Sequence, residues 1–169
     1  MGKEIEHVDL VNRLGIIQVR NVPKNEIEKY PDLYLQIIIA VILNKNGEIL
    51  VQKRSLNKKT EPGFIDHICG AIISGETPEQ AAEREGYEES HIKPNNLKII
   101  DAGVNIYNRY RYLLIGMSNL TPQNGNINET EWVRFIPFNK LVEKHISGEW
   151  KFVDEFFEDT RKAIESKKT

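Results

Sequence analysis

The chain has 169 residues, of which 40% are hydrophobic and 28% charged, and its formal net charge is −2. These values predict one globular domain with a sizeable core, and the near-neutral charge gives no electrostatic reason to expect duplex nucleic acid as a partner. No apolar run approaches the roughly 20 residues that cross a bilayer, and the N-terminus lacks a signal peptide's apolar stretch. A single cysteine, Cys69, excludes an internal disulfide and fits a reducing compartment. We therefore expect a cytoplasmic protein that makes no membrane contact.

The N-terminal region is predicted to be a β-hairpin with a polar connection. Apolar and polar residues alternate over residues 7–22 around a turn at residues 12–15. The connection that follows, residues 21–31, includes a candidate short helix at residues 24–28. We expect residues 1–31 to be an extension and residues 32–169 to be the main domain.

The next two segments read as a pair of strands. Residues 35–43 (LQIIIAVIL) are nearly continuous in β-branched side chains, which predicts a strand buried on both faces. The turn signal at residues 44–47 predicts that residues 48–54 return beside it. A basic loop at residues 58–63 and a strand within residues 64–73 follow.

The central helix has clear signals at both ends. Thr77 can cap it, Pro78 suits its first position, and Gln80 completes a capping-box pattern. Pro94 closes the helical region.

The C-terminal half adds strands and two helices to this framework. We expect strands at residues 97–104, 107–118 and 132–136, a polar loop at residues 121–130 that rims the active site, and helices at residues 138–145 and 153–167. Strands first, a helix in the middle and a helix at the end predict an α+β layered domain with a mixed sheet.

Residues 70–92 (GAIISGETPEQAAEREGYEESHI) carry the strongest functional signal. Helical positions three and four apart share a face, so Glu85, Glu88 and Glu89 can point toward one small volume. That arrangement is repulsive unless a cation lies there, and Mg²⁺ prefers oxygen ligands and substrate phosphates. The alternative is a solvated helix surface, which is what most charge runs are. Like charges at this spacing would cost an isolated helix about 0.2–0.5 kcal/mol per pair, which favours the metal site.

The same run resembles the Nudix box. That pattern is Gly, five residues, Glu, seven residues, Arg-Glu, an aliphatic, one residue, Glu-Glu, one residue, Gly and an aliphatic. The matching residues are Gly70, Glu76, Arg84, Glu85, Glu88, Glu89 and Ile92. Gly86 replaces an aliphatic, and inside a helix it should cost about 1 kcal/mol relative to alanine. His91 replaces a glycine where the helix ends in a left-handed residue, a conformation in which His is enriched.

The resemblance implies a Nudix fold, with a mixed sheet between helices (α/β/α), and hydrolysis of a diphosphate linkage, usually in a nucleoside diphosphate derivative. It implies Mg²⁺, or Mn²⁺ in its place, as the cofactor that neutralises charge in the transition state. The implied metal site comprises Gly70, Glu85, Glu88 and Glu89. One carboxylate could instead orient or deprotonate the attacking water. The resemblance also leaves room for a homodimer.

Several neighbouring residues have two interpretations. Arg84 is expected to pair with a box glutamate and hold it in place. Glu76 is either a ligand through water or a group that structures the loop. Glu129 and Glu131 could supply an extra ligand or base, with an ordinary acidic surface loop as the alternative. Tyr107, Tyr110 and Tyr112 are assigned to sheet packing, with base stacking as a minor alternative.

A second resemblance concerns the subgroup. The stretch LVQKRSLNKKTEPGFIDHICGAIISGE is similar to isopentenyl-diphosphate isomerases and their hydrolase-like relatives, which raises Arg54 and Lys58 as phosphate-binding residues. Cys69 stands where the isomerases place a catalytic cysteine, but Ala71 replaces their metal-binding histidine. Leu33, Tyr34 and Leu35 occupy the place of a further histidine, so the resemblance favours hydrolysis over isomerisation.

Three functions remain open at this point. The first is a Nudix pyrophosphohydrolase, the second an isomerase, and the third a catalytically silent nucleotide-binding module. Cys69 also has the simpler interpretation of a small buried residue. His67 could be a core histidine or a ligand, and a lone histidine is weak evidence for a metal.

Overall fold

The long apolar strand β3 (Tyr34–Leu43) lies at the centre of the computed structural model, which describes residues 4–169. It pairs in parallel with β8 (Tyr110–Met117) along one edge and antiparallel with β6 (Ile68–Ala71) along the other. β7 (Asn95–Val104) continues the sheet antiparallel to β8. The sheet is mixed, as the order of the elements predicts.

The returning strand expected after β3 is present, but its pairing with β3 is confined to the turn. The turn after β3 predicts a hairpin with β4 (Ile49–Arg54), yet only Leu43 and Ile49 pair across it. β4 instead pairs antiparallel with β9 (Thr130–Ile136) and with the short β5 (Ile65–Asp66). The reason is that a strand has two hydrogen-bonding edges, and β8 and β6 occupy both edges of β3.

The predicted N-terminal hairpin is present as β1 (His7–Val11) and β2 (Ile17–Pro23), followed by the 3₁₀ helix η1 (Lys24–Lys29). β1 also pairs with the first residues of β3. The hairpin has a small core of its own, in which Val8 and Leu10 pack with Ala71 of β6. The division into an extension and a main domain stays a prediction.

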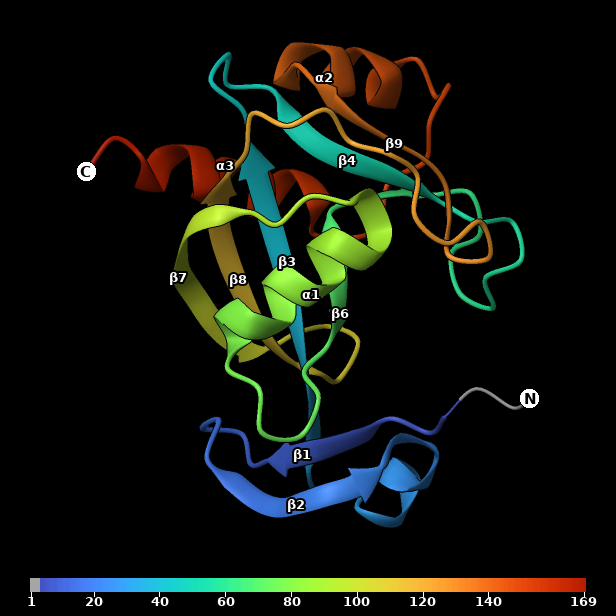
Figure 1. Cartoon of the computed structure of the whole chain (residues 1–169), viewed down its shortest axis with the longest axis vertical. Helices are drawn as coiled ribbons and strands as arrows, with labels where there is room; N and C mark the ends of the chain where they lie inside the picture. The colour runs from blue at the N-terminus through green and yellow to red at the C-terminus, as the bar shows by residue number, and fades with distance from the viewer. Residues whose placement is uncertain (1–3) are drawn as a thin grey trace.

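Helices cover both faces of the sheet, as Figure 1 shows. α1 (Pro78–Ser90) lies in front of β3 and β6, and α3 (Phe156–Ser166) lies behind β3 and β8. α2 (Phe138–Ile146) lies near β4 and β9 at the top of the view. This layered α+β arrangement confirms the predicted fold class.

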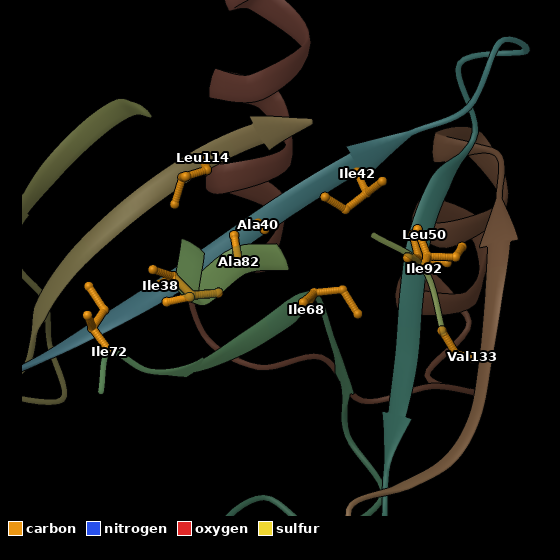
Figure 2. Packing of buried hydrophobic residues seen from close by; sticks show 11 residues of the cluster. Ile38, Ala40, Ile42, Leu50, Ile68, Ile72, Ala82, Ile92, Leu114 and Val133 are labelled. Atoms are coloured by element: carbon orange, nitrogen blue, oxygen red, sulfur yellow. The ribbon is translucent and has the colours of Figure 1, made fainter. Parts of the chain in front are cut away.

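Strand alternation divides the core between these two faces. Ile38, Ala40 and Ile42 of β3 point toward α1, where Figure 2 shows them with Ala82 of the helix. Val41 and Leu43 join the cluster on the other face, which includes Phe156 of α3. Within residues 4–169, no helix has both the length and the apolar composition that crossing a membrane requires.

Candidate active site

The loop and helix that follow β6 are built as the sequence predicts. The Thr77 hydroxyl accepts a hydrogen bond from the Gln80 amide, the Gln80 side chain accepts one from the Thr77 amide, and Pro78 is the first helical residue. The helix ends at His91, whose φ of 57° is left-handed, as expected. These two ends fix which residues of α1 face the sheet.

Arg84 joins the loop to the helix. Its guanidinium donates to both carboxylate oxygens of Glu76, at 2.7 and 2.9 Å, and to Glu85 at 2.7 Å. It also donates to the main-chain oxygen of Ala71 at 2.9 Å. The hydrogen bonds with Glu76 raise the pKa of Arg84 still further, so the side chain is a permanent cation. The expected pairing of Arg84 with a box glutamate is confirmed.

Glu76 has a loop-structuring role in this structure. Besides binding Arg84, its Oε2 accepts a hydrogen bond from the Ile73 amide at 3.0 Å, which closes the turn before α1. Both carboxylate oxygens are therefore engaged within the protein.

Glu85 lies directly against β6. A Cβ added to Gly70 would overlap the Glu85 carboxylate, so only glycine permits this approach. Burial raises the pKa of Glu85 to about 7, and the ion pair and hydrogen bond with Arg84 offset this only in part. The charges of Glu88 and of Glu6, which precedes β1, add to the rise.

Glu89 lies beside Glu85 on the same side of the helix. Its carboxylate accepts a hydrogen bond from the Cys69 amide at 3.3 Å and another from the Gln52 side chain. Burial raises the pKa of Glu89 well above the usual value, and the charge of Glu85 raises it further. Two adjacent carboxylates thus compete for ionisation.

Glu88 is placed differently, because its side chain is 58% exposed and its carboxylate lies 3.7 Å from Arg84. Within residues 4–169, no three acidic, His or Cys side chains are already arranged to hold a metal ion. The three box glutamates therefore share one end of the helix without converging.

A divalent cation nevertheless fits this set of residues. Glu85 and Glu89 are hard oxygen donors whose ionised forms are disfavoured by burial and mutual repulsion, and a cation would relieve both. Gly70 can contribute only main-chain atoms, and the missing side chain is what brings Glu85 against β6. Glu88 lies one residue before Glu89 at the exposed edge of the same turn.

The basic loop at the end of β4 lies near the candidate site. Arg54 is largely committed to the protein, because it contacts Asp66 at 3.2 Å and the main-chain oxygen of Thr60 at 3.0 Å. Lys58 pairs with Glu129, and Lys53 pairs with Glu131 at 2.9 Å. Glu129 therefore stands at the rim of the loop, paired with one of the residues expected to bind phosphate.

Cys69 and Ala71, the two positions that distinguish the isomerases, have clear environments. The Cys69 thiol donates to the Asp66 carboxylate at 3.3 Å, and burial raises the pKa of this thiol, helped by the charges of Asp66 and Glu89. The Ala71 side chain packs in the apolar cluster of the N-terminal hairpin. A protonated cysteine is present here, and an apolar residue occupies the place of the imidazole ligand.

His67 is a core residue on the opposite face of the sheet. Its ring stacks on Phe156 at 4.2 Å between centroids, and its Nε2 lies 3.0 Å from the Thr160 hydroxyl. Burial lowers the pKa of His67 to about 4, so the ring is neutral. Its Nδ1 has no hydrogen-bond partner among the residues that the structure describes.

Tyr107, Tyr110 and Tyr112 do not share one environment. Tyr110 and Tyr112 pack edge to face at 5.3 Å, as the packing interpretation expects. Tyr107 is more exposed, and its hydroxyl donates to Glu61 at 2.8 Å.

Gly86 corrects an expectation about the box. We predicted a simple loss of helix stability from a residue that has no side chain to bury. In the structure, a Cβ at this position would lie 2.7 Å from the main-chain oxygen of Ile92 and 3.0 Å from Pro94. Glycine is required here because the segment after the helix folds back against it.

Several residues around the site were not found from the sequence. Gln52 is 2% exposed, and its side chain reaches His67, Thr130 and Glu89. The one available signal was a polar residue inside the apolar strand ILVQKR. Gly125 had no local signal, because the helix that it contacts comes from a distant segment. The ion pair of Asp66 with Arg54 likewise joins two separate strands.

Comparisons with known proteins agree with this geometry. The family model of the NUDIX domain matches residues 33–156. The chain is 32% identical to an uncharacterized Nudix hydrolase of Listeria innocua over 77% of this chain and 79% of that protein. It is 40% identical to an isopentenyl-diphosphate Delta-isomerase of Corynebacterium diphtheriae, over only 33% of this chain and 31% of the isomerase.

A solved structure supports the fold independently. The crystal structure of DR0079 from Deinococcus radiodurans superposes with a TM-score of 0.73 at 22% identity, covering 94% of this chain and 99% of that one. The box residues, the layered fold and the matched domain lead to one conclusion: the chain belongs to the Nudix family.

Proposed function

We propose that this protein is a Mg²⁺-dependent pyrophosphohydrolase that cleaves a diphosphate linkage in a nucleoside diphosphate derivative. The observation that carries the proposal is the pair Glu85 and Glu89, two adjacent, partly buried carboxylates with raised pKa values and an arginine bound to one of them. Membership of the Nudix family supports the reaction class. The proposal includes a cytoplasmic location and Mn²⁺ as an alternative to Mg²⁺.

The residues that would hold the metal are Glu85, Glu88 and Glu89, with the main chain of Gly70. When bound, the metal would draw negative charge away from the diphosphate as water attacks phosphorus. Arg84 keeps Glu85 oriented through a 2.7 Å contact, while Glu76 fixes the other side of the guanidinium. Gln52 and the Cys69 amide orient Glu89 in the same way.

Substrate binding would use the rim of the basic loop. Lys58 is the more available cation, because Arg54 is already bound to Asp66 and Thr60. A diphosphate that binds Lys58 would compete with Glu129 for it. Glu129 would then be released to act on the attacking water or as a further ligand.

The isomerase alternative has one observation in its favour, the contact between Cys69 and Asp66. Two findings weigh against it: Ala71 packs in an apolar cluster, and His67 lies in the core behind the sheet. A silent nucleotide-binding module would retain the fold, but it gives no reason for two partly buried carboxylates to lie together.

The test is a hydrolysis screen of the full chain with Mg²⁺ and with Mn²⁺ against nucleoside diphosphate derivatives. We expect metal-dependent product release by the wild type, strong loss in Glu88→Gln, and full activity in Glu83→Gln, an exposed glutamate of the same helix. Binding of these ligands without turnover would support the silent module. Conversion of isopentenyl to dimethylallyl diphosphate that depends on Cys69 would support the isomerase.

A further inference from the structure

The loop between β8 and β9 makes direct contact with the end of α1. We call residues 119–129 the clamp loop. The Gly125 amide donates to the carbonyl of Glu89 at 3.1 Å, and the Gln123 amide donates to the carbonyl of Ser90 at 2.9 Å. Both acceptors belong to the last turn of the helix that carries the box glutamates.

These two bonds supply donors to carbonyls at the end of α1 that have none within the helix. The last four carbonyls of a helix have no donor within it. The left-handed His91 directs its amide to the carbonyls of Gly86 and Tyr87. The clamp loop then supplies donors to the carbonyls of Glu89 and Ser90, which follow them along the turn.

Gly125 lies directly against the main chain of the helix. A Cβ at this position would overlap the main-chain oxygen of Glu88 and lie 3.0 Å from the carbonyl carbon of Glu89. Gly125 is not among the glycines with positive φ, so its lack of a side chain, rather than its backbone conformation, is what the contact requires.

The clamp loop is itself fixed to β9. The Asn124 side chain accepts a hydrogen bond from the Val133 amide and donates one to the Glu131 carbonyl, both at 3.1 Å. Ile92, two residues after the last residue of α1, packs with Leu50 and Val133, as Figure 2 shows. The end of α1 is therefore held both by the loop and by the apolar core.

The far end of the clamp loop reaches the basic loop. Glu129 pairs with Lys58, and its carbonyl accepts a hydrogen bond from the Ser55 amide at 3.0 Å. One short segment thus connects the rim residue expected to bind phosphate with the turn that carries Glu88 and Glu89.

We propose that Gly125 is a positioning residue, through which the clamp loop holds the last turn of α1 so that Glu88 and Glu89 stay in register with Glu85 and Gly70. This inference rests on the proposed metal site. It assigns the clamp loop a task in metal binding, in addition to its place at the rim. A side chain at position 125 would push the turn and its two carboxylates away from β6.

The test compares Gly125→Ala with Gly103→Ala, because a Cβ at Gly103 meets nothing within 4 Å. Three quantities are measured: Mn²⁺ affinity by calorimetry without substrate, amide hydrogen exchange of the metal-free protein, and kcat and KM. In Gly125→Ala we expect roughly tenfold or greater loss of Mn²⁺ affinity and of kcat, the size seen when a residue that supports a metal ligand is removed. The KM should change far less, and the amides of Ser90 and His91 should exchange faster. Gly103→Ala should behave as wild type.

If a folded Gly125→Ala variant bound Mn²⁺ as tightly as the wild type, the inference would be overturned. It would also be overturned if Gly125→Ala and the control Gly103→Ala both lost affinity by the same factor. If Gly125→Ala does not fold, Asn124→Ala decides, because it loosens the loop without inserting atoms at the helix. We expect weaker Mn²⁺ binding in that variant, and unchanged binding contradicts the proposal. Failure of the proposed function would look different: the wild type would bind Mn²⁺ and respond to Gly125→Ala yet hydrolyse no diphosphate.

Discussion

Two clusters of charged side chains lie on opposite faces of the same sheet. The box cluster, under α1, comprises Arg84 with four carboxylates, Glu76, Glu85, Glu88 and Glu89. The α3 cluster comprises Arg111 and Lys162 with three carboxylates, Asp101, Asp159 and Glu158. The box cluster therefore has a larger excess of negative charge.

A raised pKa alone does not distinguish the two clusters. Burial raises the pKa of Glu85 and of Asp159 alike, each to about 7. The difference lies in the partners. Arg111 contacts Asp159 directly at 2.6 Å, whereas Glu89 accepts hydrogen bonds, forms no ion pair with any residue of 4–169, and lies beside another carboxylate. Surplus charge, more than a shifted pKa, is what indicates a site for a cation.

The largest effect is expected in the α3 cluster. Replacing Arg111 by Met would leave Asp159, whose side chain is 2% exposed, without its ion-pair partner. At pH 8, where Asp159 is ionised, the free energy of unfolding should fall by about 3–5 kcal/mol. Urea unfolding measures this, and hydrolysis per folded molecule should stay at the wild-type level. A loss of stability too small to detect would show that the α3 cluster is not structural.

The box cluster should respond in the opposite sense. Glu89→Gln should lower kcat/KM by at least about a hundredfold, the upper end of the range for residues that support a metal ligand. Its free energy of unfolding should not fall, because the variant removes a buried charge that lies beside Glu85. Kinetics and urea unfolding on one preparation test both statements. If Glu89→Gln lost stability but kept activity, the two clusters would have the same role.

A smaller effect is expected at the rim. Lys58→Met should raise KM about tenfold, equal to about 1.4 kcal/mol of binding free energy, and change kcat little. The control is Lys98→Met, on the exposed part of β7. An equal rise of KM in both variants would remove Lys58 from the substrate site.

A further prediction concerns pH. A carboxyl group with a raised pKa binds more protons in the folded state, so stability should decrease as pH rises from about 4.5 to about 7 and change little above that. Glu85→Gln and Asp159→Asn should each make this decrease shallower. Saturating Mn²⁺ should remove the part of this pH-dependent decrease that Glu85 causes and leave the part that Asp159 causes. Unfolding curves at several pH values would show the difference. If Mn²⁺ left the contribution of Glu85 to this decrease unchanged, Glu85 would not contact the metal.

Local signals in the sequence predicted much of this structure. Thr77, Pro78 and Gln80 define the start of α1, and His91 defines its end, because each acts on residues within one turn. The spacing of four residues between Arg84 and Glu88 likewise places the two side chains on one face of the helix, where their charged groups lie 3.7 Å apart. The same periodicity places Glu85 and Glu89, two of the three glutamates expected to bind the metal, on the inner side of α1.

Contacts between distant segments were not predictable in this way. β4 leaves β3 because β6 takes its place, which depends on how the whole sheet assembles. From the sequence, Gly86 looks like a destabilising residue in a helix, because its contact with the main chain of Ile92 appears only in the tertiary structure. The contact of Gly125 with α1 likewise appears only there. These glycines mark close approaches, and such approaches are properties of the tertiary structure.

The central claim is that the surplus carboxylates of the box cluster bind a divalent cation. Calorimetric titration of the metal-free protein with Mn²⁺ tests it most directly, with Glu89→Gln and Glu158→Gln as a matched pair from the two clusters. We predict saturable binding to the wild type and to Glu158→Gln, and binding at least about tenfold weaker to Glu89→Gln. Equal affinity of all three proteins for Mn²⁺, or no binding by the wild type, would contradict the claim.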